Sequence, residues 1–354
     1  MSTGFTISVN FTATRCPCTP IIVSFTTSFF ENQYKFLSQP LIIKIGKMSS
    51  EINRFFKSKT LSSTYKPTLL KCFLDIGDYQ DGEGGQWIER KKDTYVVDMH
   101  FIAARFLRYY HPLRFKFNLK QQATKGTIEI YQILEKYEKE LGVKKIPSKK
   151  TMCSDKLKII REKAISSSAI KDLVLPLLLK DCDVYKIINN SKSVEIKKEI
   201  VEYMKNNKNV IEAGLNHMIA KYLEGINSSP NISTKLEEKI PRTTLKPNPF
   251  QEIIDMQDSR CFYCKTKGNS FEQEHFIPWN FLYHTENYNI IAACKSCNGS
   301  KNDRLPHEKY LEDIIDRNKN LNNLPMGYSE EFMRNMHENC KLDYHGKDKK
   351  LWEL

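Results

Sequence analysis

The sequence predicts a mainly helical N-terminal region followed by a small α+β domain near the C-terminal end. Two observations predict this fold class. Apolar residues recur at helical spacing through much of the first two thirds of the chain. Two CxxC pairs then follow within one short segment, Cys261 with Cys264 and Cys294 with Cys297. Four cysteines at this spacing are typical of a small domain that binds Zn²⁺ in place of a large apolar core.

The first 47 residues differ in composition from those that follow. They are rich in Thr, Ser, Ile and Phe, and Thr and Ser interrupt the apolar stretch IIVSFTTSFF, so they make a poor secretory signal. Met48 opens a segment of very different character. Residues 1–47 are therefore expected to be a poorly ordered leader or an artefact of gene calling, and a short β-hairpin is the alternative.

The charge of the chain favours contact with nucleic acid. The 55 Lys and Arg residues exceed the 42 Asp and Glu residues, which gives a net charge of +13. A positive excess raises the local concentration of polyanions, although simple solubility is the alternative explanation. No apolar run is long enough to span a bilayer, so no membrane partner is expected. Four further cysteines, Cys72, Cys153, Cys182 and Cys340, are scattered and are expected to be reduced, as in a cytoplasmic protein. Cys16 and Cys18 have no second pair nearby, so no metal site is expected there.

Residues 48–226 are predicted to form a helical recognition domain. Two apolar stripes at helical spacing flank the glycine-rich run 81–85, and the second is expected to end at Pro112. Residues 95–97 between them are predicted to be a short strand. The stripe residues are Tyr65, Leu69, Leu70, Phe73 and Leu74, then Met99, Ile102, Ala103, Phe106, Leu107 and Tyr110. This order allows a winged-helix-like DNA reader, and plain core packing is the alternative.

Further helices are predicted along the second half of this region. One spans Ile130 to Leu141, another is marked by Ile196 to Met204, and the clearest spans Val210 to Leu223. No internal repeat is apparent. Residues 227–250 carry several prolines and are predicted to be a linker. Residues 251–325 are then expected to form the zinc-containing domain, and residues 326–354 a C-terminal tail.

The segment between the cysteine pairs carries polar residues in a strand, strand, helix order. Residues 271–278 have strand character, residues 288–292 are predicted to be a returning strand, and a short helix follows the last cysteine. This order would place Glu274, His275 and Asn298 around one point. A neutral imidazole can take a proton from water near pH 7, and carboxylate and amide oxygens suit Mg²⁺. The pattern favours metal-assisted phosphodiester hydrolysis.

These residues resemble the HNH, or ββα-metal, endonuclease family. The resemblance covers roughly residues 261–320 and rests on Cys261, Cys264, Glu274, His275, Pro278, Asn289, Cys294, Cys297, Asn298, Lys301, Leu305 and Pro306. It implies a ββα-metal fold with a structural Zn²⁺ on the four cysteines. It also implies that His275 is the general base, that Asn289 orients it, and that Glu274 and Asn298 bind a catalytic Mg²⁺ or Mn²⁺.

Two positions depart from the family pattern. Asn298 stands where many members have histidine, and Glu274 stands where aspartate is usual. Glu272, two residues earlier on the same face of the strand, can assist or replace Glu274. Lys301 and Arg304 are expected to contact nucleic-acid phosphates, with a solvated helix face as the alternative.

The upstream region is similar to HNH proteins of the restriction and phage-defence type. The similarity rests on Thr64–Lys66, Tyr109–Pro112 and Tyr222–Asn227. The expected function is therefore an endonuclease that hydrolyses double-stranded DNA in restriction or phage defence. A non-catalytic zinc protein that binds nucleic acid and a homing or RNA-directed nuclease are the alternatives. A homodimer, and a methyltransferase or other defence partner, are left open.

Overall fold

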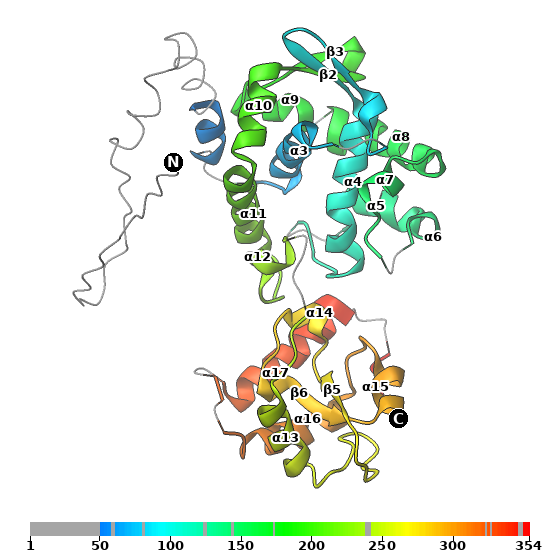
Figure 1. Cartoon of the computed structure of the whole chain (residues 1–354), viewed down its shortest axis with the longest axis vertical. Coiled ribbons are helices and arrows are strands. Elements are labelled where there is room, and N and C mark those ends of the chain that lie inside the picture. Colours follow the sequence, from blue (N-terminus) through cyan, green and yellow to red (C-terminus); the bar gives the residue numbers. More distant parts are fainter. Residues whose placement is uncertain are drawn as a thin grey trace, which may run out of the picture. The chain divides into compact units, whose positions relative to one another are not determined.

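The computed structural model describes residues 50–57, 61–79, 82–122, 126–142, 145–172, 174–237, 242–322, 324–325, 328–345 and 350–354. Met48–Leu354 forms one compact unit, in which the described elements are mainly helices with two small antiparallel sheets (Figure 1). The leader expected at residues 1–47 lies outside the described residues.

Two long helices, α3 (Tyr65–Leu74) and α4 (Met99–Phe115), pack against each other at the start of this unit. Every residue of the two predicted apolar stripes is buried, so both helices are confirmed. The prediction that the second helix ends at Pro112 is wrong. Proline removes only its own backbone N–H, and the helix continues to Phe115, beyond which the N–H of Lys116 donates to the carbonyl of Pro112.

A four-stranded antiparallel sheet joins two copies of one local arrangement. Its strands, in the order β1-β2-β4-β3, are β1 (Ile88–Arg90), β2 (Thr94–Asp98), β4 (Ser193–Lys197) and β3 (Lys186–Ile188). In each copy a helix precedes a hairpin whose second strand runs directly into another helix. The flanking helices are α3 and α4 in the first copy, and α9 (Val174–Asp181) and α10 (Lys198–Asn206) in the second. The two copies meet where β2 pairs with β4.

Three features predicted from the sequence can be compared with this arrangement: a strand, a helix and the absence of an internal repeat. The strand predicted at residues 95–97 is confirmed as part of β2. The helix predicted from Ile196 begins later, because Ile196 belongs to β4 and α10 starts at Lys198. The duplication itself was not apparent in the sequence. The two hairpins pair through backbone hydrogen bonds and buried Val and Ile side chains, which many different sequences satisfy.

Other helices complete the first part of the unit: α5 (Glu129–Lys136), α6 (Glu138–Leu141), α7 (Lys149–Met152), α8 (Lys158–Ser166), α11 (Lys208–Glu224) and α12 (Ile232–Lys235). The single helix predicted from Ile130 to Leu141 is divided at Tyr137. The expected linker, residues 227–250, contains α12, whose buried Lys235 donates to the backbone carbonyl of Phe281 at 2.5 Å. This segment is therefore packed against the residues that follow it.

The C-terminal part is built on a second small sheet. Its elements are α13 (Pro247–Met256), β5 (Glu272–His275), α14 (Trp279–Leu282), β6 (Ile290–Ala293), α15 (Lys295–Lys301), α16 (Leu311–Asn318) and α17 (Glu330–Asn339). β5 and β6 are antiparallel, with Glu274 opposite Ile291 and His275 opposite Ile290. The order strand, strand, helix expected between and after the cysteine pairs is present.

Within the segment expected to form a tail, 326–354, several of the described residues contribute to the core of this part. Met333 on α17, Cys340 and Trp352 are buried together with Phe276. The N–H of Trp352 also donates to the carbonyl of Leu305 at 2.8 Å. The expectation of a separate tail is therefore wrong, because these apolar side chains fill the core beside the small sheet.

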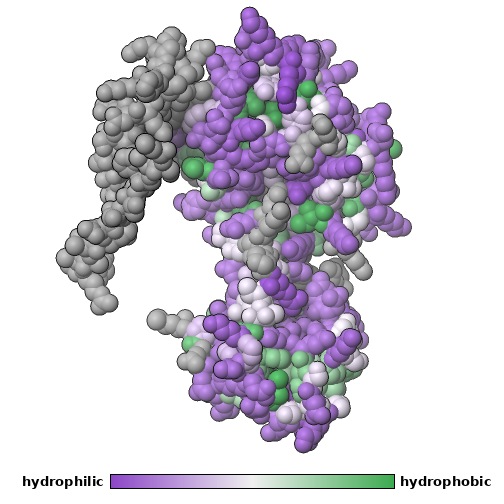
Figure 2. Space-filling view, in the orientation of Figure 1, coloured by the Kyte–Doolittle hydropathy of each residue, from purple (hydrophilic) through white to green (hydrophobic). Residues whose placement is uncertain are grey.

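Polar side chains dominate the surface. On the face drawn in Figure 2, hydrophilic residues prevail and apolar residues form only small patches. Among the described residues, none of the helices has both the length and the apolar character needed to cross a bilayer.

Candidate metal centre and active-site cleft

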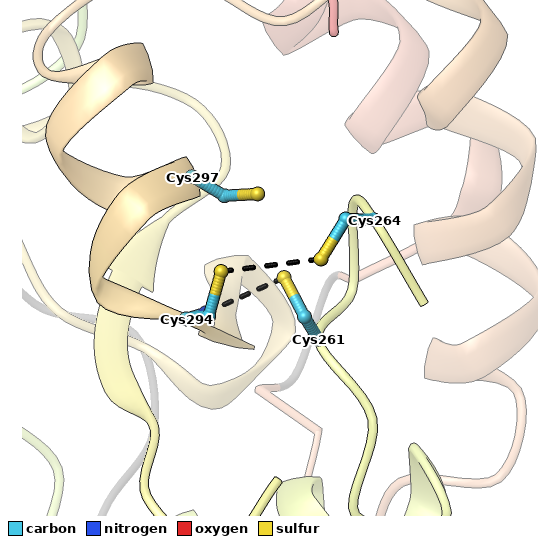
Figure 3. A group of neighbouring side chains, drawn as sticks. All are labelled: Cys261, Cys264, Cys294 and Cys297. Atoms are coloured by element: carbon cyan, nitrogen blue, oxygen red, sulfur yellow. Dashed lines mark hydrogen bonds between the residues drawn. The ribbon is translucent and has the colours of Figure 1, made fainter. Parts of the chain in front are cut away.

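The four cysteines of the two CxxC pairs converge on one point. Their sulfur atoms all lie within 4.8 Å of one another, and those of Cys264 and Cys294 are 3.9 Å apart (Figure 3). Zn–S bonds of about 2.3 Å in a tetrahedron require sulfur separations of roughly 3.8 Å. The donor set and its spacing therefore fit a structural Zn²⁺, as the sequence predicts.

Local backbone geometry brings the sulfurs together. The first pair lies in a tight turn, where the N–H of Cys261 donates to the carbonyl of Thr266 at 2.9 Å and Lys265 has a φ of +58°. The second pair begins at the N-cap of α15, so that Cys294 and Cys297 sit on its first turn. The backbone N–H of Cys294 also points at the sulfur of Cys261, 3.3 Å away. Such a contact stabilises thiolate charge.

His275 lies at the end of β5, and both of its ring nitrogens have partners. Nδ1 is 2.8 Å from a guanidinium nitrogen of Arg242, and Nε2 is 3.1 Å from the hydroxyl of Thr285. Since arginine only donates, Nδ1 must accept, and we assign the ring proton to Nε2. The hydroxyl of Thr285 then donates to the carbonyl of Thr243 at 2.9 Å. This chain of hydrogen bonds fixes both the tautomer and the orientation of the ring.

The imidazole is covered rather than exposed. His275 has an exposed fraction of only 3%, although it lines a cleft of about 620 Å³. Burial, together with the charges of Arg242 and Lys301, lowers the pKa of His275 to about 3. The ring is therefore neutral at pH 7, as a general base requires. The group in contact with Nδ1 is the side chain of Arg242, itself an exposed residue.

Asn289 joins the end of β5 to the start of β6. Its side chain is fully buried and forms two hydrogen bonds with Ile277, accepting from the N–H at 2.8 Å and donating to the carbonyl at 2.9 Å. Its own carbonyl accepts from the N–H of Phe276 at 2.8 Å. Asn289 thus holds the backbone directly after His275, which is the positioning role that the resemblance implies.

Glu274 and Lys301 form a buried ion pair beneath the cleft. The ammonium of Lys301 is 2.5 Å from the Glu274 carboxylate and 2.8 Å from the backbone carbonyl of His275. Burial raises the pKa of Glu274, although the charge of Lys301 opposes this, and burial lowers the pKa of Lys301. Lys301 has no exposed surface. The expectation that it contacts nucleic-acid phosphates is therefore corrected, because its ammonium serves Glu274 and the backbone of β5.

Of the remaining predicted residues, Asn298 and Glu272 line the same cleft and Arg304 does not. Asn298 on α15 is half-buried, and its amide nitrogen donates to the carboxylate of the exposed Glu272 at 2.6 Å. Glu272, Glu274, His275 and Asn298 all line the cleft. Arg304 is exposed and hydrogen bonds to the backbone carbonyl of Ser300, so its expected role as a phosphate contact is compatible with its position.

The oxygen donors of the cleft suit a hard cation. Glu272, Glu274 and Asn298 offer carboxylate and amide oxygens, and Mg²⁺ commonly uses one or two carboxylates and keeps several waters. Within the described part of the chain, the cysteine cluster is the only group of three or more His, Cys, Asp or Glu side chains at metal-ligand spacing. The cleft therefore offers donors without a preformed cage of charged ligands.

Sequence reasoning missed three residues of the cleft and its surroundings. Arg242 and Thr285 contact His275, and the exposed Lys295 lines the cleft from the first turn of α15. Arg242 and Thr285 lie in irregular segments, and neither has a spacing that links it to the cysteine frame. No signal in the sequence pointed to Arg242 or Thr285. Lys295, by contrast, is a basic residue between two cysteines of the frame, and this position could have suggested a place in the site.

The comparisons with known proteins agree with this geometry. A family model described as HNH endonuclease matches residues 261–304, the segment that holds the four cysteines, β5, β6 and α15. Neither the search of curated proteins nor that of solved structures gave a match. Residues 261–304 are thus supported as an HNH endonuclease domain, and this domain indicates nuclease activity.

Proposed function

We propose that this protein is an endonuclease that hydrolyses phosphodiester bonds of double-stranded DNA with a divalent metal ion. The observation that carries the proposal is the arrangement of His275, Glu274 and Asn298 around one solvent-accessible cleft, beside a cysteine cluster with zinc geometry. The match to the HNH endonuclease model supports the reaction class. The net charge of +13 supports a polyanionic substrate.

In the proposed reaction, each residue of the cleft has a separate role. His275 is held as the neutral tautomer and takes a proton from the attacking water. Asn289 keeps the backbone around His275 in place. Glu274 and Asn298, with Glu272 beside them, would hold Mg²⁺ or Mn²⁺. When bound, such an ion stabilises negative charge on the phosphate and on the departing 3′ oxygen.

The biological role that we infer is restriction or phage defence in the cytoplasm. It rests on the similarity of the upstream helical region to proteins of that type. The duplicated hairpin and helix arrangement upstream would then select the target, and a pair of chains would make a double-strand cut. The restriction or defence role does not depend on how the cleft hydrolyses DNA, so it needs its own test. That test is plasmid digestion with modified and unmodified DNA.

The test of the chemistry is plasmid digestion by wild type and His275→Ala, with and without Mg²⁺. Loss of a general base lowers a rate by about two to four orders of magnitude, so His275→Ala should leave almost no cutting. Zinc content, thermal unfolding and DNA affinity should stay near their wild-type values. Cutting by His275→Ala at the wild-type rate would reject the assignment, and DNA binding without cutting by either protein would favour a non-catalytic zinc module.

A further inference from the structure

The segment that enters the C-terminal part lies along the cleft. The backbone of Leu245 forms two hydrogen bonds with the side chain of Gln273 on β5, of 2.7 and 3.0 Å. Two residues earlier, the carbonyl of Thr243 accepts from Thr285. These contacts place Arg242 at the edge of the cleft, where its guanidinium lies against Nδ1 of His275. Arg242 precedes the segment 261–304 that matches the family model.

The position of this guanidinium coincides with the place where a substrate has to lie. Nδ1 of His275 is the only ring nitrogen that lacks a proton in the assigned tautomer, so the attacking water must bind there. A water held by Nδ1 lies about 2.8 Å from it, and the reacting phosphorus lies about 3 to 3.5 Å further on. The scissile phosphate therefore enters the space beside the Arg242 guanidinium.

The charges around the cleft leave few cations for this phosphate. Of the lysines and arginines, only Arg242 and Lys295 line the described cleft, since Lys301 is buried against Glu274. Lys295 is exposed on α15, and of the two only Arg242 touches the base. A guanidinium presents two parallel N–H groups that match two oxygens of a phosphate.

We propose that Arg242 binds the scissile phosphate, and that its contact with His275 is a resting state which the substrate exchanges. This proposal rests on the proposed nuclease function. As DNA enters, the guanidinium moves from Nδ1 to the phosphate oxygens, and a water takes its place on Nδ1. The same movement therefore neutralises the phosphate and frees the base, so that His275 is available only when substrate is present.

Hydrolysis then proceeds by one proton transfer to His275 and one exchange of bonds at phosphorus. The water transfers a proton to Nδ1, and its oxygen bonds to phosphorus as the bond from phosphorus to the 3′ oxygen breaks. The 3′ oxygen takes a proton from solvent, and the imidazolium, held through Nε2 by Thr285, later returns its proton to solvent. Arg242 stays on the phosphate and stabilises the charge that develops on its oxygens.

The experiment compares wild type with Arg242→Gln, Arg242→Lys and the control Arg260→Gln. Arg260 is exposed in the same part of the protein and does not line the cleft, so the control removes the same charge elsewhere. DNA affinity is measured against salt concentration without added Mg²⁺, and single-turnover cleavage is measured with Mg²⁺. Zinc content and thermal unfolding show that each variant is folded.

Arg242→Gln should reduce the slope of log affinity against log salt by about one, as expected for one lost phosphate contact. Its cleavage rate should fall by about 10²–10³, the usual effect of removing one donor to a developing oxyanion. Arg242→Lys should recover part of the rate, because it keeps the charge without the paired N–H groups. Arg260→Gln should resemble wild type in both measurements.

Two results would overturn the proposal. One is an unchanged salt slope in Arg242→Gln, and the other is cutting as fast as or faster than wild type, which would make Arg242 only a cap on the base. Failure of the nuclease function gives a different pattern. If wild type cuts no DNA but Arg242→Gln still loses about one unit of slope, the phosphate contact stands and hydrolysis is rejected.

Discussion

Replacing Lys301 by methionine tests whether this lysine is a buried structural partner or a phosphate contact. Methionine has a similar length but no charge, so the change leaves the Glu274 carboxylate buried without its ion-pair partner. The side chains of Lys301 and Glu274 are 0% and 5% exposed, so solvent screens the pair very little. Breaking such a pair by removing one partner costs about 3 to 5 kcal/mol.

The lower end of this range follows from the chemistry of the carboxyl group. An unpaired Glu274 can avoid its buried charge by taking up a proton. Its ordinary pKa is 4.5, and the 2.5 pH units between 4.5 and 7 correspond to about 3 kcal/mol at pH 7. In the variant, burial raises the pKa of Glu274 further because the charge of Lys301 no longer opposes it. The loss of stability is therefore complete above that raised pKa and disappears as the pH falls toward 4.5.

The assay is urea unfolding of the zinc-loaded protein at pH 7 and pH 5, with Lys295→Met as the control. Lys295 is exposed on the same helix, so its replacement should change stability by less than about 0.5 kcal/mol. The salt dependence of DNA binding should stay unchanged in Lys301→Met. A stability loss below about 1 kcal/mol, together with a salt slope reduced by about one, would refute the buried-pair interpretation and restore the phosphate contact.

Two further predictions concern the zinc centre and a buried histidine. Wild type should contain about one Zn²⁺ per chain and Cys294→Ser much less, and loss of zinc should unfold the C-terminal part, as measured by metal analysis and circular dichroism. His111 is buried, its ring nitrogens have no hydrogen-bond partner within the described chain, and its pKa is lowered from 6.5 to about 4. The unfolded chain therefore binds the proton first, and wild type should lose about 2 kcal/mol of stability between pH 7 and pH 5 through this group. His111→Leu should remove that loss in urea unfolding while the exposed His217→Leu keeps it, and equal pH dependence in all three proteins would contradict the assignment.

The parts of the fold that were predictable are those set by local patterns. Helical spacing located α3 and α4, because each side chain of a stripe meets the core through its own position along the helix. CxxC spacing located the cysteine cluster, since each tight turn brings two sulfurs to one point. The contribution of Trp352 to the core was not predictable, because a lone tryptophan near the end of a polar segment belongs to no helical or strand pattern of apolar residues.

The candidate site was likewise predictable from the sequence only in part. The order strand, strand, helix was enough to predict that Glu274, His275 and Asn298 meet at one cleft. It did not reveal that the lysine three residues after Asn298 turns inward. A helix places residues three apart on one face, but the partner of each side chain depends on what lies beneath that face. Beneath α15 lies the carboxylate of Glu274, which would be costly to bury without a cation.

The buried pair explains why an arginine from outside the motif is needed at the cleft. Once Lys301 is committed to Glu274, the segment that matches the family model supplies Lys295 and no other lysine or arginine to the lining. Before a divalent ion binds, a phosphodiester beside His275 would still face the exposed carboxylate of Glu272, and repulsion would oppose its binding. Arg242 offsets this repulsion from the segment that connects the upstream helices to the cleft. A change in that connection would therefore alter the charge at the base as well as its access to water.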